Sequence, residues 1–200
     1  IILNGKNEWL ADRILNFELS HENVNKELSN PNKEIKDIAF CTILKNRVFH
    51  GGIIAKGSGM LKNGENGKGI ASRWYAKTLA DRIRAINFIK HKIQFLQTDA
   101  FKVIEQNSDN RNAYFFIDPP YTIAGKRLYT YFDIDHEQLF YLTSKIQGKF
   151  MLTYDDTEEI RALADKYHLA FRTIPMKTTH HLEKNEIIIS DNFDWWTRTT

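Results

Sequence analysis

Regularly spaced apolar residues in the first 45 positions of the chain predict helices. In "WLADRILNFEL", the side chains of Leu10, Ile14 and Phe17 fall on one stripe, because residues three or four apart share a helix face. The segment "EIKDIAFCTIL" predicts a second such stripe, formed by Ile35, Ile38 and Ile43 or nearby residues. We therefore expect a helical N-terminal region.

The pattern changes between residues 51 and 69, where "GGIIAKGSGMLKNGENGKG" holds seven of the ten glycines. So many glycines predict a long loop, and loops of this length in compact domains are usually functional or disordered. The following "RWYAKTLADRIRAINFIK" predicts an amphipathic helix with Arg and Lys on its polar face. Its apolar face consists of Tyr75, Leu79, Ile83, Ile86 and Ile89.

Beyond residue 92, short apolar runs alternate with helical patterns. The runs "KIQFLQ", "KFMLTY", "LAFRTI" and "NEIIIS" predict strands, and "NAYFFI" predicts a fully buried strand. "DAFKVIEQ" predicts a short helix, and two capping boxes, Asp135 with Gln138 and Asp156 with Glu159, predict two more. Strands alternating with helices indicate an α/β fold with a largely parallel sheet covered on both faces.

The composition is that of a globular protein with one sizeable core, since 42% of the residues are hydrophobic and 12% are aromatic. The single cysteine, Cys41, excludes an intrachain disulfide and favours a reducing compartment, and its apolar neighbours indicate a small core residue. No apolar run approaches the roughly 20 residues of a membrane span. The first residues are also too polar for a secretory signal. We expect a soluble cytoplasmic protein without a membrane partner.

Positive charge is concentrated in residues 45–92, which hold eleven Lys and Arg but only Glu65 and Asp81, although the net charge of the chain is only +3. Such a block is typical of proteins that bind phosphate groups, and a solvated helix face explains it equally well. We expect two regions. Residues 1–92 are helical, glycine-rich and basic, and residues 93–200 form the α/β portion.

The stretch "FFIDPPYT" places a rigid polar group directly after a predicted strand. In α/β sheets, ligands bind beyond the carboxyl ends of the strands, where Asp118 is expected to lie. The two prolines hold Asp118 and Pro119 extended. They leave two acceptors, the Asp118 carboxylate and the Pro119 carbonyl, followed by the ring of Tyr121. Two acceptors and a stacking ring suit a planar base with an exocyclic amine, whose lone pair they can direct at an electrophile.

"DPPY" at the end of an apolar strand is the catalytic motif of amino-group methyltransferases, and the chain resembles the DNA adenine-specific type that uses S-adenosylmethionine. Other segments resemble this family in the family's own order: "LKNRVFHGG", "SRWY" with "TLADRI", "IQFLQTDAF", "RLYTYFDIDHEQLF", "FMLTYDD" and "NEIIIS". The resemblance covers residues 35–190. It implies a Rossmann-like methyltransferase sheet preceded by a DNA-recognition insertion in residues 1–92.

The resemblance assigns roles by position. Asp118 and the Pro119 carbonyl would hold the target amine, Pro120 completes the rigid motif, and Tyr121 would stack on the adenine. Asp99 in "QTDAF" stands where the family has an acid near the adenine of the cofactor, and it could equally well cap the following helix. The target base must leave double-stranded DNA at a cost of a few kcal/mol, which phosphate contacts would offset. The candidates for these contacts are Arg47, Lys56, Lys68 and Arg73, whereas we expect His50 to be incidental.

The chain departs from the family in one respect. The sequence contains no recognisable "FxGxG" cofactor loop and no acid for the cofactor ribose. The glycines of residues 51–69 are no substitute, because they do not join a strand to a helix. The family's motif order places both features before residue 1. We therefore expect the central and C-terminal part of an enzyme, with weak or no binding of S-adenosylmethionine by this part alone.

Several alternatives stay open. A cytosine amine or an RNA base would be methylated by related chemistry, although cytosine enzymes usually have Ser in place of Asp118. A catalytically silent DNA-binding module would keep the basic block without the cofactor. Methylation of a protein amide is disfavoured, because such enzymes have Asn at this position. Our leading hypothesis is adenine methylation in a bacterial or phage restriction-modification system, which implies a restriction endonuclease as partner.

Two further motifs carry weaker signals. "THHLE" offers His180, His181 and Glu183 to a metal, but adjacent histidines point in different directions and no further ligands are obvious. We therefore predict no metal site. Trp195 and Trp196 indicate packing or interaction rather than chemistry.

Overall fold

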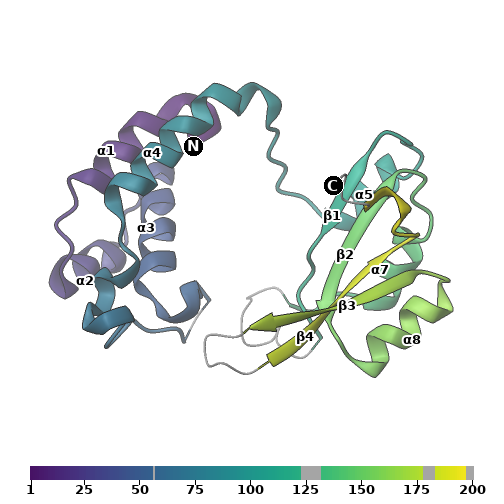
Figure 1. The fold of residues 1–200 in the computed structure, drawn as a ribbon. Coiled ribbons are helices and arrows are strands. Elements are labelled where there is room, and N and C mark those ends of the chain that lie inside the picture. The colour runs from purple at the N-terminus through teal and green to yellow at the C-terminus, as the bar shows by residue number, and fades with distance from the viewer. Residues whose placement is uncertain (56, 123–131, 178–182, 197–200) are drawn as a thin grey trace. The chain divides into compact units, whose positions relative to one another are not determined.

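The computed structural model describes most of the chain, namely residues 1–55, 57–122, 132–177 and 183–196. Its contacts divide the chain into an N-terminal unit, Ile1–Leu96, and a C-terminal unit, Gln97–Thr200 (Figure 1). Each unit has its own hydrophobic core, so the expectation of one sizeable core is wrong. No described helix is long and apolar enough to cross a membrane.

The N-terminal unit is helical, as its apolar spacing predicts. Its longer helices are α1 (Asn7–Leu15), α2 (His21–Ser29), α3 (Ile35–Val48) and α4 (Ala76–Ile89). Short helical turns occupy Ile2–Lys6, His50–Gly52, Glu65–Gly67, Gly69–Arg73 and Lys90–Lys92. The predicted glycine-rich loop therefore consists of short turns, together with an isolated antiparallel bridge between Phe49 and Met60.

The buried face of α3 differs from the predicted stripe. Phe40, Leu44 and Val48 are fully buried, whereas Ile35 and Ile38 are 75% and 52% exposed. The buried residues are four apart, so they form one row along the helix, and Ile35 and Ile38 lie on its opposite side. The helix is predicted correctly, but the choice of its core face from Ile35 is wrong.

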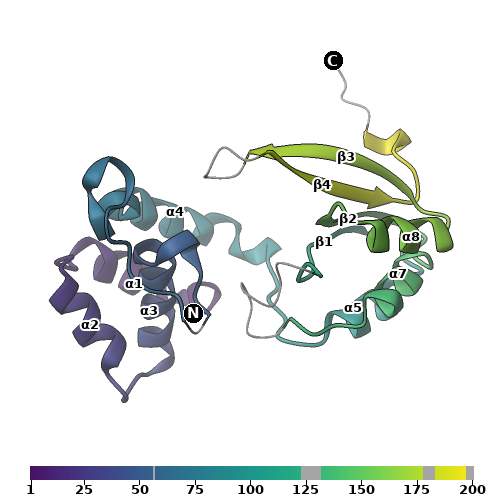
Figure 2. The same cartoon turned by 90° about the horizontal axis from the view of Figure 1, so that it is seen from below.

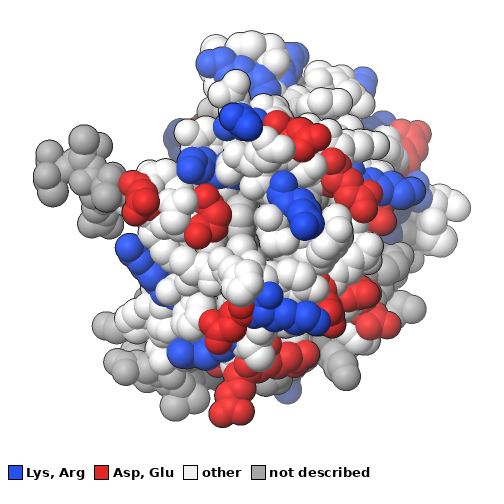
Figure 3. Space-filling model, turned by 90° about the vertical axis from the view of Figure 1, so that its right-hand side faces the viewer, with Lys and Arg blue, Asp and Glu red and all other residues white. Residues whose placement is uncertain are grey.

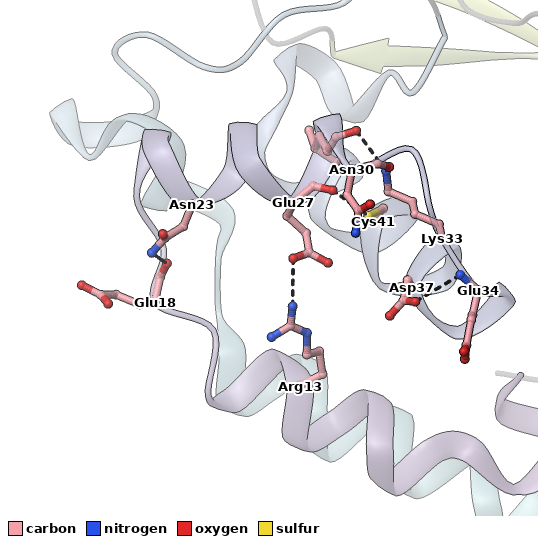
Figure 4. A network of polar contacts seen from close by, with 10 residues as sticks. Arg13, Glu18, Asn23, Glu27, Asn30, Lys33, Glu34, Asp37 and Cys41 are labelled. Carbon is pink, nitrogen blue, oxygen red and sulfur yellow. Dashed lines mark hydrogen bonds and ion pairs between the residues drawn. The ribbon is translucent and has the colours of Figure 1, made fainter.

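Polar contacts join the first three helices (Figure 4). Arg13 of α1 donates to the Glu27 carboxylate of α2 at 2.8 Å. At the start of α3, the Glu34 amide donates to the Asp37 carboxylate at 3.1 Å, which completes a capping box. Cys41 is buried, and burial raises the pKa of its thiol. These observations agree with a structural role for Cys41.

Gly64 makes a close backbone approach within the glycine-rich segment. Its φ of +59° lies in the left-handed region, and an added Cβ would lie 2.3 Å from the Gly69 carbonyl oxygen and 2.5 Å from the Ser72 hydroxyl. Gly59, by contrast, has open space where a Cβ would stand. The glycines of this segment therefore differ in how strictly the fold requires them.

The C-terminal unit contains a four-stranded sheet in the order β1-β2-β4-β3. The strands are β1 (Tyr114–Ile117), β2 (Lys149–Asp155), β3 (Ala170–Lys177) and β4 (Glu183–Ser190). β1 and β2 are parallel, whereas β4 is antiparallel to both β2 and β3. The α/β class is confirmed, but the sheet is mixed rather than largely parallel. Five residues separate β3 from β4, too few for the crossover that a parallel pair requires.

The helices α5 (Ala100–Asn107), α7 (His136–Thr143) and α8 (Glu158–Lys166) lie on one side of the sheet (Figure 2). Their apolar side chains pack with those of β2 that point to this side, which are Phe150, Leu152 and Tyr154. On the other face, Tyr114 and Phe116 of β1 are 76% and 70% exposed. The predictions of a sheet covered on both faces and of a fully buried strand in "NAYFFI" are wrong for the described residues, because α5, α7 and α8 all pack on the opposite face of the sheet.

The helix starts were predicted with mixed success. At α7, Asp135 accepts a hydrogen bond from the Gln138 amide at 2.8 Å, which confirms the N-cap half of the predicted capping box. At α8 the cap is Thr157 rather than Asp156, and its hydroxyl accepts from the Ile160 amide at 3.3 Å. The Asp156 carboxylate instead binds two nitrogens of Arg161 at 2.6 and 2.8 Å. These bonds hold the pKa of Asp156 below its ordinary value.

The predicted strand "KIQFLQ" does not form. Ile93, Phe95 and Leu96 have extended or irregular backbone and are 42%, 76% and 56% exposed. Alternation of apolar residues makes a strand only where another strand supplies hydrogen-bonding partners, and none in the described residues pairs with this segment. Near the other end of the unit, Trp195 packs edge-on against Tyr114 with ring centres 6.4 Å apart, as expected of a packing residue.

Candidate active site and nucleic-acid interface

The carboxyl ends of β1 and β2 meet at one edge of the sheet, because these strands are parallel. Their register pairs Ile117 with Leu152, so the next residues, Asp118 and Thr153, stand side by side. Asp118 is exposed, and its Oδ1 accepts a hydrogen bond from the Thr153 hydroxyl at 2.7 Å. The structure therefore places an accessible carboxylate where α/β folds bind ligands.

The rest of the motif is anchored to the core. Pro119 is buried, and Pro120 and Tyr121 are half-buried. The Tyr121 ring packs near that of Tyr154, with centroids 6.0 Å apart and planes inclined by 32°. Tyr154 is fully buried, its hydroxyl lies 2.7 Å from Nδ1 of His136, and burial raises its pKa. Tyr121 thus has a rigid aromatic side chain beside it.

Asp155 is a second acid at this edge, and we did not single it out from the sequence. It is only 2% exposed, and its Oδ1 lies 3.5 Å from the Thr122 hydroxyl. Its Oδ2 has no hydrogen-bond partner among the described residues. Asp155 lies two residues after Thr153, so the alternation of β2 could have placed it on the same face as Thr153.

Asp99 lies at the start of α5. Its Oδ1 accepts a hydrogen bond from the Phe101 amide at 3.0 Å, so Asp99 is the N-cap of that helix. The capping role that the sequence left open is confirmed. The side chain is exposed, and a cofactor contact through its other oxygen stays a prediction.

The four predicted phosphate-binding residues have different surroundings. Lys68 is exposed, next to the turn Gly69–Arg73. Arg73 is half-buried and donates to the Phe49 carbonyl, so it joins the two ends of the glycine-rich segment. Lys56 lies outside the described residues, and His50 is exposed.

The fourth, Arg47, lines a hollow of about 360 Å³ between α3 and α4, which we call the α3–α4 hollow. Arg82 of α4 also lines it, and neither arginine forms an ion pair with a described acid. The remaining lining is mostly apolar and consists of Thr42, Ile43, Asn46, Ile54, Leu79, Ile83 and Ile86. Sequence reasoning missed Arg82, because only the fold of the unit brings it to the same hollow as Arg47.

Other cations of the basic block are held by acids. Arg84 of α4 donates to Glu8 at 2.9 Å and to Asp12 at 2.7 Å, which connects α4 to α1. The hydrogen bond to Glu8 raises the pKa of Arg84. Lys77 pairs with Asp81 at 2.7 Å. The basic block thus contains cations that stabilise the fold and cations that are available to a ligand.

Charge is also divided between the two units. The N-terminal unit has 16 Lys and Arg against 9 Asp and Glu, whereas the C-terminal unit has 12 against 16. On the side of the molecule drawn in Figure 3, positive and negative side chains are interleaved without a large patch of one sign. A polyanion would therefore be attracted to the N-terminal unit rather than to the C-terminal unit.

The candidate metal ligands of "THHLE" lie largely outside the described residues, since neither His180 nor His181 is described. The part of the chain that is described contains no group of three or more His, Cys, Asp or Glu that could hold a metal ion.

The "DPPY" motif and the segments around it match a known protein family. A family model for D12 class N6 adenine-specific DNA methyltransferases matches residues 52–182. The chain belongs to this methyltransferase family. The matched region begins in the glycine-rich segment and includes α4, β1, Asp118 and β2, which confirms the resemblance seen in the sequence. Among curated proteins, none matches the chain.

Membership of a methyltransferase family implies, in general, that S-adenosylmethionine is the methyl donor. Among the described residues, the exposed Asp99 carboxylate fits the adenosine end of that molecule, because one of its oxygens remains available to an amine or hydroxyl donor.

Proposed function

We propose that this protein transfers a methyl group from S-adenosylmethionine to the N6 amine of adenine in double-stranded DNA. The observation that carries the proposal is the exposed Asp118 carboxylate at the carboxyl end of β1, followed by two prolines and Tyr121. Membership of the adenine-specific DNA methyltransferase family supports the choice of base and of reaction.

The chemistry follows from the two acceptors of the motif. The lone pair of the adenine amine is delocalised into the ring, so the amine is a poor nucleophile. Hydrogen bonds from its two N–H groups to the Asp118 carboxylate and the Pro119 carbonyl favour a pyramidal nitrogen with a directed lone pair. S-adenosylmethionine, when bound, would supply the electrophilic methyl group and be released as S-adenosylhomocysteine. The methylated nitrogen would then lose one proton to solvent. The Asp118 carboxylate also stabilises the positive charge that develops on the nitrogen.

The target base has to leave the duplex before it can meet Asp118. This step costs a few kcal/mol of stacking, which stacking on Tyr121 and contacts to phosphates would offset. Tyr121 suits this role because Tyr154 packs beside it. In the N-terminal unit, we propose phosphate contacts by Arg47, Lys68 and the newly identified Arg82.

Asp99 completes the proposed site as a contact to the adenosine part of the cofactor. Methylation at a defined DNA site also fits a restriction-modification system with an endonuclease partner. The sequence resemblance alone supports this last part of the proposal.

The test is transfer of a labelled methyl group from S-adenosylmethionine to unmethylated duplex DNA. Asp118→Ala should lower the rate at least about 100-fold, because it removes an acceptor aimed at the reacting nitrogen. Asp165→Ala, which removes an exposed acid from α8, is the matched control and should leave the rate unchanged. Activity that survived Asp118→Ala would contradict the mechanism. N4-methylcytosine among the product nucleosides, or RNA as the better acceptor, would contradict the proposed substrate.

A catalytically silent DNA-binding module is the second candidate, because the separation of charge between the units favours DNA binding irrespective of catalysis. Calorimetry with S-adenosylmethionine distinguishes the two. Cofactor binding by the chain supports the enzyme, whereas salt-sensitive DNA binding without cofactor binding supports the module.

A further inference from the structure

The Thr153 hydroxyl is bonded to the carboxylate on which the proposed reaction depends. The distance of 2.7 Å from Thr153 Oγ1 to Asp118 Oδ1 is typical of a hydroxyl that donates to a charged oxygen. The same hydroxyl lies 3.5 Å from the Ile117 carbonyl, which is too long for a comparable bond. Because a hydroxyl has one hydrogen, Thr153 donates it to Asp118.

Thr153 is held more firmly than Asp118. β2 lies between β1 and β4, and Thr153 pairs with Ile188 of β4. Its branched side chain has restricted rotation about χ1. Asp118 follows the end of β1, which in the described sheet pairs on one side only. The donor is therefore fixed, and the carboxylate is the group that needs to be oriented.

An exposed carboxylate normally samples several rotamers. A bond from Thr153 to Oδ1 restricts this freedom and leaves Oδ2 able to accept from another donor. A hydroxyl also leaves the negative charge intact, whereas a Lys or Arg partner would compensate it. Within the described residues, no Lys or Arg forms an ion pair with Asp118.

We propose that Thr153 is a positioning residue, which holds the Asp118 carboxylate in one orientation with Oδ2 directed to the amine of the target base. The catalytic consequence rests on the proposed function. The orientation of the carboxylate does not, so it can be measured without DNA or cofactor.

The orientation is tested by NMR couplings that report χ1 of Asp118 in the full chain. The unsubstituted protein and Thr153→Ser should show one rotamer, and Thr153→Val should show averaging over several. The control is Thr173→Val, because the Thr173 hydroxyl lies near a different aspartate, with 3.3 Å between its oxygen and Asp156 Oδ2. It should leave Asp118 in one rotamer. A single rotamer in Thr153→Val would overturn the proposal.

A second measurement needs no variant and covers the case in which Thr153→Val does not fold. In the unsubstituted protein, the NMR couplings should report a single χ1 rotamer for Thr153 as well as for Asp118, because the hydrogen bond fixes both side chains. Averaging of either side chain over several rotamers would overturn the proposal.

The catalytic consequence is tested by methyl transfer. Thr153→Val should lower kcat about tenfold, equivalent to about 1.4 kcal/mol in the barrier, with the KM for DNA unchanged. Thr153→Ser should restore kcat, and Thr173→Val should match the unsubstituted protein. An unchanged kcat in Thr153→Val would overturn the positioning role. If calorimetry shows that the protein binds S-adenosylmethionine, but it transfers no methyl group while the couplings respond as expected, the proposed function fails and the orientation of Asp118 by Thr153 stands.

Discussion

Replacement of both Arg47 and Arg82 with Ala should weaken DNA binding and flatten its dependence on salt. Both residues line the α3–α4 hollow, and neither forms an ion pair with a described acid. A cation that is already paired would first have to leave its carboxylate. The unpaired arginines are therefore the stronger candidates for phosphate contacts in the N-terminal unit.

The magnitude follows from the release of counterions. Each phosphate contact contributes about 0.9 to the slope of log K for DNA binding against log salt concentration. At about 0.1 M salt, one such contact raises the affinity about eightfold, which corresponds to about 1.2 kcal/mol of binding free energy. If Arg47 and Arg82 each contact one phosphate, the double variant should lose about 1.8 from the slope and about 60-fold in affinity at that salt concentration.

The assay is fluorescence anisotropy of a labelled duplex, titrated with protein over a series of salt concentrations. Arg84→Ala is the matched control, because it removes the same charge from α4 at a position where the guanidinium binds Glu8 and Asp12. It should leave the slope unchanged and lower the thermal stability of the N-terminal unit. The reasoning is refuted if the double variant keeps its slope, or if Arg84→Ala flattens it equally.

Two further predictions concern stability. Arg161 holds the pKa of Asp156 below its ordinary value of about 3.9. The ion pair of Asp156 with Arg161 therefore stabilises the folded state above that pH, and this stabilisation is lost as the pH falls through the pKa of Asp156 in the folded protein. Urea unfolding of Asp156→Asn should accordingly depend less on pH in acid than that of the unsubstituted protein, and identical pH profiles would contradict this. Leu152→Ala should cost about 2–5 kcal/mol because Leu152 is fully buried, and Phe116→Ala should cost far less because Phe116 is 70% exposed. Equal losses in chemical denaturation would show that both sheet faces are covered.

The elements that were predicted correctly depend on local sequence. The helices of the first 45 residues and the strands β2, β3 and β4 follow from spacing, because the apolar period decides which side chains can share a face. The "DPPY" motif is equally local, since two prolines restrict the backbone wherever the chain lies. The position of Asp118 directly after a strand therefore follows from the amino-acid sequence alone.

The features that were missed depend on which segments meet. "KIQFLQ" alternates like a strand but has no partner among the described residues. Thr153 became a candidate only when the register of β1 and β2 set it beside Asp118. No pattern within one segment contains this information.

The contrast between Gly64 and Gly59 has a consequence for how freely the glycine-rich segment can vary. At position 64 even alanine would bring its Cβ against the Gly69 carbonyl oxygen, so substitutions there should be eliminated by their effect on the fold. Position 59 faces open space and tolerates larger side chains. Natural variation, or a designed library, can therefore explore position 59 while position 64 preserves the shape of the segment.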